Sequence, residues 1–156
     1  MHGEAAPRPT EADEPLRLRL GEHLPHTLRQ SADAVSRLIA RAYEDRFSLS
    51  IPEWRLMAWL AECGPASEAK IAAAMPDAVT ARRAAEALTI RGAAQRTAAG
   101  LALTEAGQHL YDEIAPLVLA YEAALLTGLS PGEVTALKHL LKRVHAAADR
   151  LRGPAP

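Results

Sequence analysis

The chain has 156 residues, of which 49% are hydrophobic, 24% are charged and only 4% are aromatic, and its formal net charge is −1. This length suits one domain of ordinary size with its own hydrophobic core. The low aromatic content and the many alanines favour helix over sheet. The near-neutral charge excludes a protein that binds nucleic acid through bulk positive charge, so any contact with DNA must come from a local patch.

The first residues and the cysteine content indicate the compartment. Residues 1–14 contain several acidic residues and prolines but almost no large apolar side chains, so we expect a disordered acidic tail and no signal peptide. The longest later apolar run, residues 114–121, is far too short to span a bilayer. Cys63 is the single cysteine, which excludes an internal disulfide and fits a reducing compartment. We therefore expect a cytoplasmic protein without a membrane partner.

A long amphipathic helix is the first predicted element. From about Leu16 to Phe47, large apolar residues recur at helical spacing and are interleaved with arginines. Pro25 lies inside this stretch, so we expect the helix to bend near it.

Three short helices are expected next, over residues 51–63, 68–75 and 78–91. Ser50, Ser67 and Asp77 precede them as N-caps, since a short polar side chain can accept a hydrogen bond from an orphan amide of the first turn. Gly64 and Gly92 end the first and the third of these helices. Three short helices with tight connections are the outline of a helix-turn-helix unit.

A small β-hairpin and two long helices complete the predicted chain. Residues 93–104 are too short and too poor in helical periodicity for another helix, so we expect a hairpin with Gly100 in its turn. Thr104 caps a helix that Gly128 ends, and Ser130 opens a capping-box pattern before the last helix. The sequence thus predicts a mostly α fold with one small β-hairpin.

Five short motifs occur along the chain in a fixed order: Leu49-Ser-Ile-Pro-Glu-Trp-Arg-Leu56, Gly64-Pro-Ala-Ser67, residues 88–92, Leu103-Thr-Glu-Ala-Gly107 and Gly128-Leu-Ser130. In this order and at this spacing they resemble the motifs of the MarR (multiple antibiotic resistance regulator) family, over roughly residues 20–152. The resemblance implies a winged helix-turn-helix with long N- and C-terminal dimerisation helices. In a single domain over residues 15–152, residues 15–48 and 104–152 would dimerise, and residues 50–103 would form the DNA-binding lobe.

The resemblance also implies an obligate homodimer. The three long helices carry more apolar surface than a lone helix needs, and a small monomer would expose a large apolar patch that a partner could cover. A monomeric helical bundle is the alternative.

The predicted DNA contacts lie mainly on the helix over residues 78–91, because the second helix of a helix-turn-helix enters the major groove. Thr80, Arg82 and Arg83 lie in its first half and are the predicted base contacts, and Arg83 falls where the family commonly places an arginine. The alternative for the arginines is a solvated helix face on which Arg82 pairs with Glu86.

Phosphate contacts are assigned to Lys70 and Arg91, which would set the register without reading sequence. The wing departs from the family pattern, because the hairpin is shorter and lacks the usual Asp-x-Arg pair. Its sole cation, Arg96, either makes a reduced backbone contact or leaves the wing barely touching DNA.

A small aromatic anion is the effector that the resemblance suggests. It would bind in a cleft between the dimerisation helices and the DNA-binding lobe, lined by His23, His26, Tyr43, Trp54 and Trp59. A purely core role for at least one tryptophan is the alternative. We predict no metal and no cofactor, since no cysteine or carboxylate accompanies the two histidines at ligand spacing. We also expect Cys63 to be an ordinary buried or half-buried thiol.

No nucleophile, base and orienting group stand at catalytic spacing, and no glycine-rich phosphate loop is present, so we predict no enzymatic activity. The expected function is a dimeric, ligand-responsive transcriptional regulator that binds a pseudo-palindromic site. The alternative is a dimeric protein-interaction module of the same fold that has lost operator binding, which the short wing and the near-neutral patch suggest.

Overall fold

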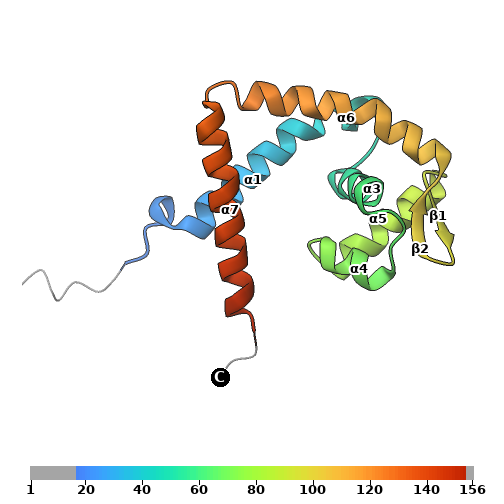
Figure 1. Ribbon diagram of the computed structural model, residues 1–156, viewed down its shortest axis with the longest axis horizontal. Coiled ribbons are helices and arrows are strands. Elements are labelled where there is room, and N and C mark those ends of the chain that lie inside the picture. Colours follow the sequence, from blue (N-terminus) through green and yellow to red (C-terminus); the bar gives the residue numbers. More distant parts are fainter. Residues whose placement is uncertain (1–16, 154–156) are drawn as a thin grey trace, which may run out of the picture. The chain divides into compact units, whose positions relative to one another are not determined.

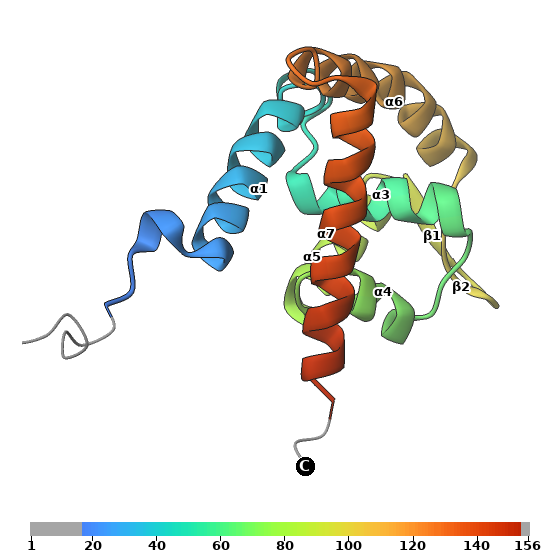
Figure 2. The same ribbon diagram turned by 60° about the vertical axis from the view of Figure 1, so that its left-hand side comes forward.

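The computed structural model describes residues 17–153, so the tail predicted at residues 1–14 lies outside the described part. The chain forms two compact units, of which one ends at Val35 and the other begins at Ser36. The elements, shown in Figures 1 and 2, are η2 (Leu20–Glu22), α1 (Leu24–Ala40), α2 (Glu44–Phe47), α3 (Ile51–Cys63), α4 (Glu68–Ala74), α5 (Ala78–Ile90), β1 (Ala94–Thr97), β2 (Gly100–Leu103), α6 (Glu105–Leu125) and α7 (Pro131–Leu151). The predicted mostly α fold with one hairpin is confirmed. Among residues 17–153, no helix has the length and apolarity needed to cross a membrane.

The first predicted helix is divided into η2, α1 and α2. Pro25 is the second residue of α1, where its missing N–H costs no helical hydrogen bond. The predicted bend at this proline is therefore wrong, because the helix begins there. The chain leaves α1 after Ala40, and Ser48 ends α2 in the left-handed conformation with φ 51°.

The helix-turn-helix begins at the predicted residues because its caps are local. The Ser50 side chain accepts from the Glu53 amide, and the Glu53 carboxylate accepts from the Ser50 amide at 2.6 Å. The Ser67 side chain caps α4 by accepting from the Lys70 amide, and the Asp77 side chain caps α5 by accepting from the Thr80 amide. Both α4 and α5 end one residue earlier than predicted.

The wing is a two-stranded antiparallel hairpin in which Ala94 pairs with Leu103 and Thr97 with Gly100. Gly100 is the first residue of β2 and not part of the turn, which consists of residues 98–99. It has φ 118°, and a Cβ there would lie 2.2 Å from the Ala66 carbonyl oxygen. This close approach fits a bridge of two backbone hydrogen bonds between Ala66 and Leu101, which attaches the wing to the connection between α3 and α4.

The core lies where α3, α5, the hairpin and α6 meet (Figure 2). Its largest fully buried side chains are Tyr43, Leu49, Leu56, Met57, Leu88 and Ile114. The core therefore packs against the buried face of α5, and the opposite face of this helix is exposed.

The last two helices are long and differ in burial. Thr104 caps α6 as predicted, but the helix ends at Leu125, before the expected stop at Gly128. Ser130 and Glu133 form the predicted capping box of α7. No residue of α7 is buried, and its exposed large apolar residues are Leu137, Leu140, Leu141, Val144 and Leu151.

Candidate nucleic-acid interface

Helix α5 is fixed on one face by small side chains. Ala81, Ala84 and Leu88 are buried at helical spacing, and α5 packs against both α3 and α4. Small residues allow the helix to approach its neighbours closely, which leaves the opposite face in solvent.

Arg82 and Arg83 are exposed on α5. Within residues 17–153, neither guanidinium takes part in an ion pair or a side-chain hydrogen bond, so the pairing of Arg82 with Glu86 that we considered does not form. Two adjacent arginines with all their donors free can bind guanine edges or phosphates.

Thr80 lies in the first turn of α5 and serves its N-cap. The Asp77 carboxylate accepts from the Thr80 amide and from the Thr80 hydroxyl, both at 2.7 Å. These hydrogen bonds hold the pKa of Asp77 below its usual value. The hydroxyl proton is therefore occupied, and Thr80 can meet DNA only as an acceptor.

The two predicted phosphate contacts have different surroundings. Lys70 is exposed on α4, and no ion pair engages its ammonium group among the described residues. The Arg91 guanidinium instead donates to the Phe47 carbonyl at 3.1 Å and to the Ser48 carbonyl at 2.6 Å. The structure thus places Arg91 against the protein's own backbone.

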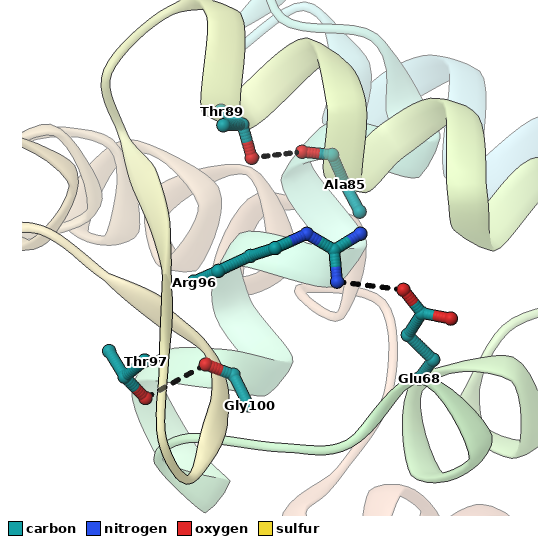
Figure 3. Close-up of polar contacts among 6 residues, drawn as sticks. All are labelled: Glu68, Ala85, Thr89, Arg96, Thr97 and Gly100. Carbon is teal, nitrogen blue, oxygen red and sulfur yellow. Dashed lines mark hydrogen bonds and ion pairs between the residues drawn. The ribbon is translucent and has the colours of Figure 1, made fainter.

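Arg96 extends from β1 to the Glu68 carboxylate on α4, as Figure 3 shows. Its hydrogen bond and its charge lower the pKa of Glu68. The pair lies at a mostly apolar groove of about 480 Å³ between α4, α5 and the wing. The polar residues that line this groove are Glu68, Arg82, Glu86, Thr89 and Arg96.

The charge of the helix-turn-helix region, residues 64–107, is nearly balanced. Its cations are Lys70, Arg82, Arg83, Arg91 and Arg96, and its anions are Glu68, Asp77, Glu86 and Glu105. Since Arg91 and Arg96 are engaged within the protein, the free cations of this surface among the described residues are Lys70, Arg82 and Arg83.

The residues predicted to line an effector cleft are not all brought together. The Tyr43 and Trp54 rings stack with centroids 5.4 Å apart, and both residues are buried. Burial raises the pKa of the Tyr43 hydroxyl. Trp54 stacks on Tyr111 of α6 at 5.7 Å, a partner that the sequence analysis missed although Tyr111 follows Leu110 on the predicted apolar helix. The core role considered for one tryptophan is confirmed for Trp54.

The other residues of this set lie elsewhere. Trp59 is half-buried and packs against the core. His23 and His26, both half-buried, lie in the unit that ends at Val35, where the His26 amide donates to the His23 carbonyl at 3.0 Å.

The remaining candidates are the possible metal ligands and Cys63. No group of three or more His, Cys, Asp or Glu residues there could hold a metal ion. Cys63 is exposed, so the expectation of a buried or half-buried thiol is wrong. It is the last residue of α3, and no further helical turn covers it.

Several proteins of known structure share this fold. No family model matches, and no similar curated protein was found. A MarR/EmrR family transcriptional regulator from Acinetobacter sp. ADP1 is 22% identical with a TM-score of 0.79, and the match covers 85% of this chain and 99% of that one. BpsR of Bordetella bronchiseptica, whose DNA binding is regulated by 6-hydroxynicotinic acid, is 22% identical with a TM-score of 0.74, over 83% and 98% of the two chains. A probable transcriptional regulator from Pseudomonas aeruginosa is 25% identical with a TM-score of 0.71, over 81% and 99%. The chain therefore has the winged helix-turn-helix fold of the MarR family of transcriptional regulators.

Proposed function

We propose that the protein is a transcriptional regulator of the MarR family that binds duplex DNA as a homodimer, with α5 as its recognition helix. The observation that carries this proposal is the free pair Arg82 and Arg83 on the exposed side of α5, whose other side is anchored by buried Ala81, Ala84 and Leu88. A recognition helix needs both a packed face that fixes its position and unpaired hydrogen-bond donors on its exposed face.

The proposed contacts divide by chemistry. Arg82 and Arg83 would bind guanine edges in the major groove, and Thr80 would accept a hydrogen bond from a base amino group. Lys70 on α4 would meet a phosphate and set the register of the complex. Arg96 would reach the DNA backbone only after it leaves Glu68. The wing therefore contributes less than the recognition helix.

The proposal of a dimer rests on apolar surface that is exposed to solvent. Leu20, Leu24 and Val35 near the start of the described chain are exposed. The exposed large apolar side chains of α7 are Leu137, Leu140, Leu141, Val144 and Leu151. Apolar surface of this extent is better buried against a second copy. We assign dimerisation to residues 15–48 and 104–152 and DNA binding to residues 50–103. A two-fold dimer would read two half-sites about 34–36 Å apart along the DNA.

An effector of small aromatic anion type is part of the proposal. BpsR responds to 6-hydroxynicotinic acid, which is an anion of this class. Tyr43 and Trp54 are buried in a stack, so Trp59, His23 and His26 are the residues of the predicted set that remain accessible. A titration with aromatic acids tests this part, because a ligand near Trp59 would quench tryptophan fluorescence and change DNA affinity together.

The DNA-binding proposal is tested by the double variant Arg82→Ala/Arg83→Ala, with duplexes selected from a random pool as the probe. Each well-placed bidentate arginine contributes about 1–3 kcal/mol of discrimination, so we expect specific affinity to fall by at least about 30-fold. The control variant, Lys142→Ala/Arg143→Ala on α7, removes the same charge outside the DNA-binding lobe. Equal losses in both variants, or no loss in the first, would contradict the assignment.

A dimeric protein-interaction module of the same fold is the second candidate. The observation that favours it is the engagement of Arg91 and Arg96 within the protein, which leaves few free cations on the lobe. Salt separates the two functions. A DNA-binding regulator loses affinity steeply as salt rises, whereas an interaction module binds no duplex even at low salt.

A further inference from the structure

Arg91 joins two segments that are more than forty residues apart in sequence. Its side chain leaves the C-terminal end of α5, and its two terminal nitrogens donate to the carbonyls of Phe47 and Ser48 at 3.1 and 2.6 Å. These carbonyls belong to the end of α2. One guanidinium therefore fixes the end of the proposed recognition helix to the segment that precedes the helix-turn-helix.

The end of α2 needs such a partner. The helix has only four residues, too few to be stable without outside contacts. Its last carbonyls have no helical donor, and a cation at a helix C-terminus is favourable. Ser48 is the one non-glycine residue with positive φ in the described chain, at 51°. Such a conformation persists only where its surroundings hold it.

Hydrogen bonds also hold the C-terminal end of α5 to the start of α6. Gly92 has φ 76°, and its carbonyl accepts from the Thr104 hydroxyl at 2.6 Å. The Ala93 carbonyl accepts from the Thr104 amide at 3.0 Å. The end of α5 is thus bound to the start of α6 through the amide and the hydroxyl of Thr104. Arg91 provides the only side-chain hydrogen bonds between the end of α5 and α2 among residues 17–153.

We propose that Arg91 is a positioning residue, which sets the orientation of α5 relative to α2 and does not contact a DNA phosphate. This inference rests on the proposed function of α5 as the recognition helix. The planar guanidinium suits the role because it presents two donors to two adjacent carbonyls at once, whereas the point charge of a lysine cannot reproduce this fork.

The conservative substitution Arg91→Lys separates this role from a phosphate contact. A lysine keeps the charge and still meets a phosphate, so a phosphate contact would survive with affinity and salt dependence near those of the wild type. A lysine cannot, by contrast, replace an arginine whose role is to position the helix. We expect Arg91→Lys to lower DNA affinity about tenfold, close to the loss in Arg91→Ala, since charge-assisted hydrogen bonds of this kind are lost in both. We also expect Arg91→Ala to leave the salt slope unchanged, whereas the loss of a phosphate contact would reduce it by about one.

Hydrogen exchange in the absence of DNA supplies an independent readout. The amides of Phe47 and Ser48 donate to the carbonyls of Tyr43 and Glu44, which are the N-cap and the first residue of α2. They should exchange about tenfold faster in both Arg91 variants. The control Arg82→Ala should leave their exchange as in the wild type. Wild-type exchange rates in both Arg91 variants, or wild-type DNA affinity in Arg91→Lys, would overturn the proposal. If the wild-type protein binds no duplex, the regulator assignment fails, while the exchange rates still report whether Arg91 holds α2.

Discussion

The Arg96 guanidinium on β1 and the Glu68 carboxylate on α4 lie 2.7 Å apart, although the two residues are 28 positions apart in sequence (Figure 3). Both side chains are largely exposed. The Glu68 carboxylate thus binds the guanidinium that the sequence analysis assigned to the DNA backbone. The pair ties the short wing to the helix-turn-helix, and under the proposed function it would compete with DNA for Arg96, the only cation of the hairpin.

The first prediction concerns this competition. Glu68→Gln should raise DNA affinity by about two- to threefold, because an exposed ion pair is weak and its removal frees Arg96. The gain should disappear in an Arg96→Gln background, so the double-mutant cycle measured by fluorescence anisotropy should show coupling. Glu86→Gln on α5 is the charge-matched control. A gain of the same size with and without Arg96 would mean that Glu68 acts through general charge alone.

The second prediction concerns acid. The pKa of Asp77 is lowered by the hydrogen bonds it accepts from Thr80. The Asp77 carboxylate therefore stabilises the folded protein above its usual pKa of about 4, and this contribution is lost as the pH falls through the lower folded value. Asp77→Asn keeps a good N-cap without the titration. We expect its Tm to fall less than that of the wild type between about pH 5 and pH 3. Parallel Tm curves for the two proteins would contradict the role of Asp77.

The helix starts could be predicted from the sequence because N-caps are local. Ser50, Ser67, Thr104 and Ser130 each cap the helix that follows, and each accepts from an amide three residues further along the chain. Such contacts need no knowledge of the tertiary structure. The winged helix-turn-helix outline follows from them together with the hairpin.

The partners of the arginines could not be predicted in this way. Arg91 and Arg96 were expected to face DNA, but their acceptors at Phe47, Ser48 and Glu68 come from distant parts of the chain. Helical spacing also continued through residues 40–47, so it gave no sign of the break after α1. Tyr43 packs in the core with Trp54 and Tyr111, and this tertiary contact accompanies the turn that separates α1 from α2.

The third prediction tests the packing of the wing against α6. A Cβ at Gly107 would lie 1.9 Å from the Ala93 carbonyl oxygen, and the backbone on both sides is held by hydrogen bonds. Gly107→Ala should therefore lower the free energy of unfolding by about 1–3 kcal/mol, as overpacking does. Gly128→Ala is the matched control, since nothing lies within 4 Å of its added methyl group. Urea unfolding midpoints distinguish the two, and equal midpoints would show that the α6 start can shift without cost.

The fourth prediction tests the unpartnered face of α7. Leu137, Leu140, Leu141 and Val144 recur at intervals of three, one and three residues and are all exposed, which places them on one stripe of a helix that buries none of its residues. A charge in the middle of a dimer interface is poorly tolerated, so Leu140→Glu should yield a monomer at micromolar concentration in sedimentation equilibrium. A monomer presents one recognition helix instead of two, so the same variant should lose most of its affinity for a two-half-site duplex. Lys142→Glu is the control. It changes the charge by two units instead of one but lies outside this stripe, so this variant should remain dimeric. If the wild-type chain itself sediments as a monomer, the apolar stripe has another role and a pseudo-palindromic site is not required.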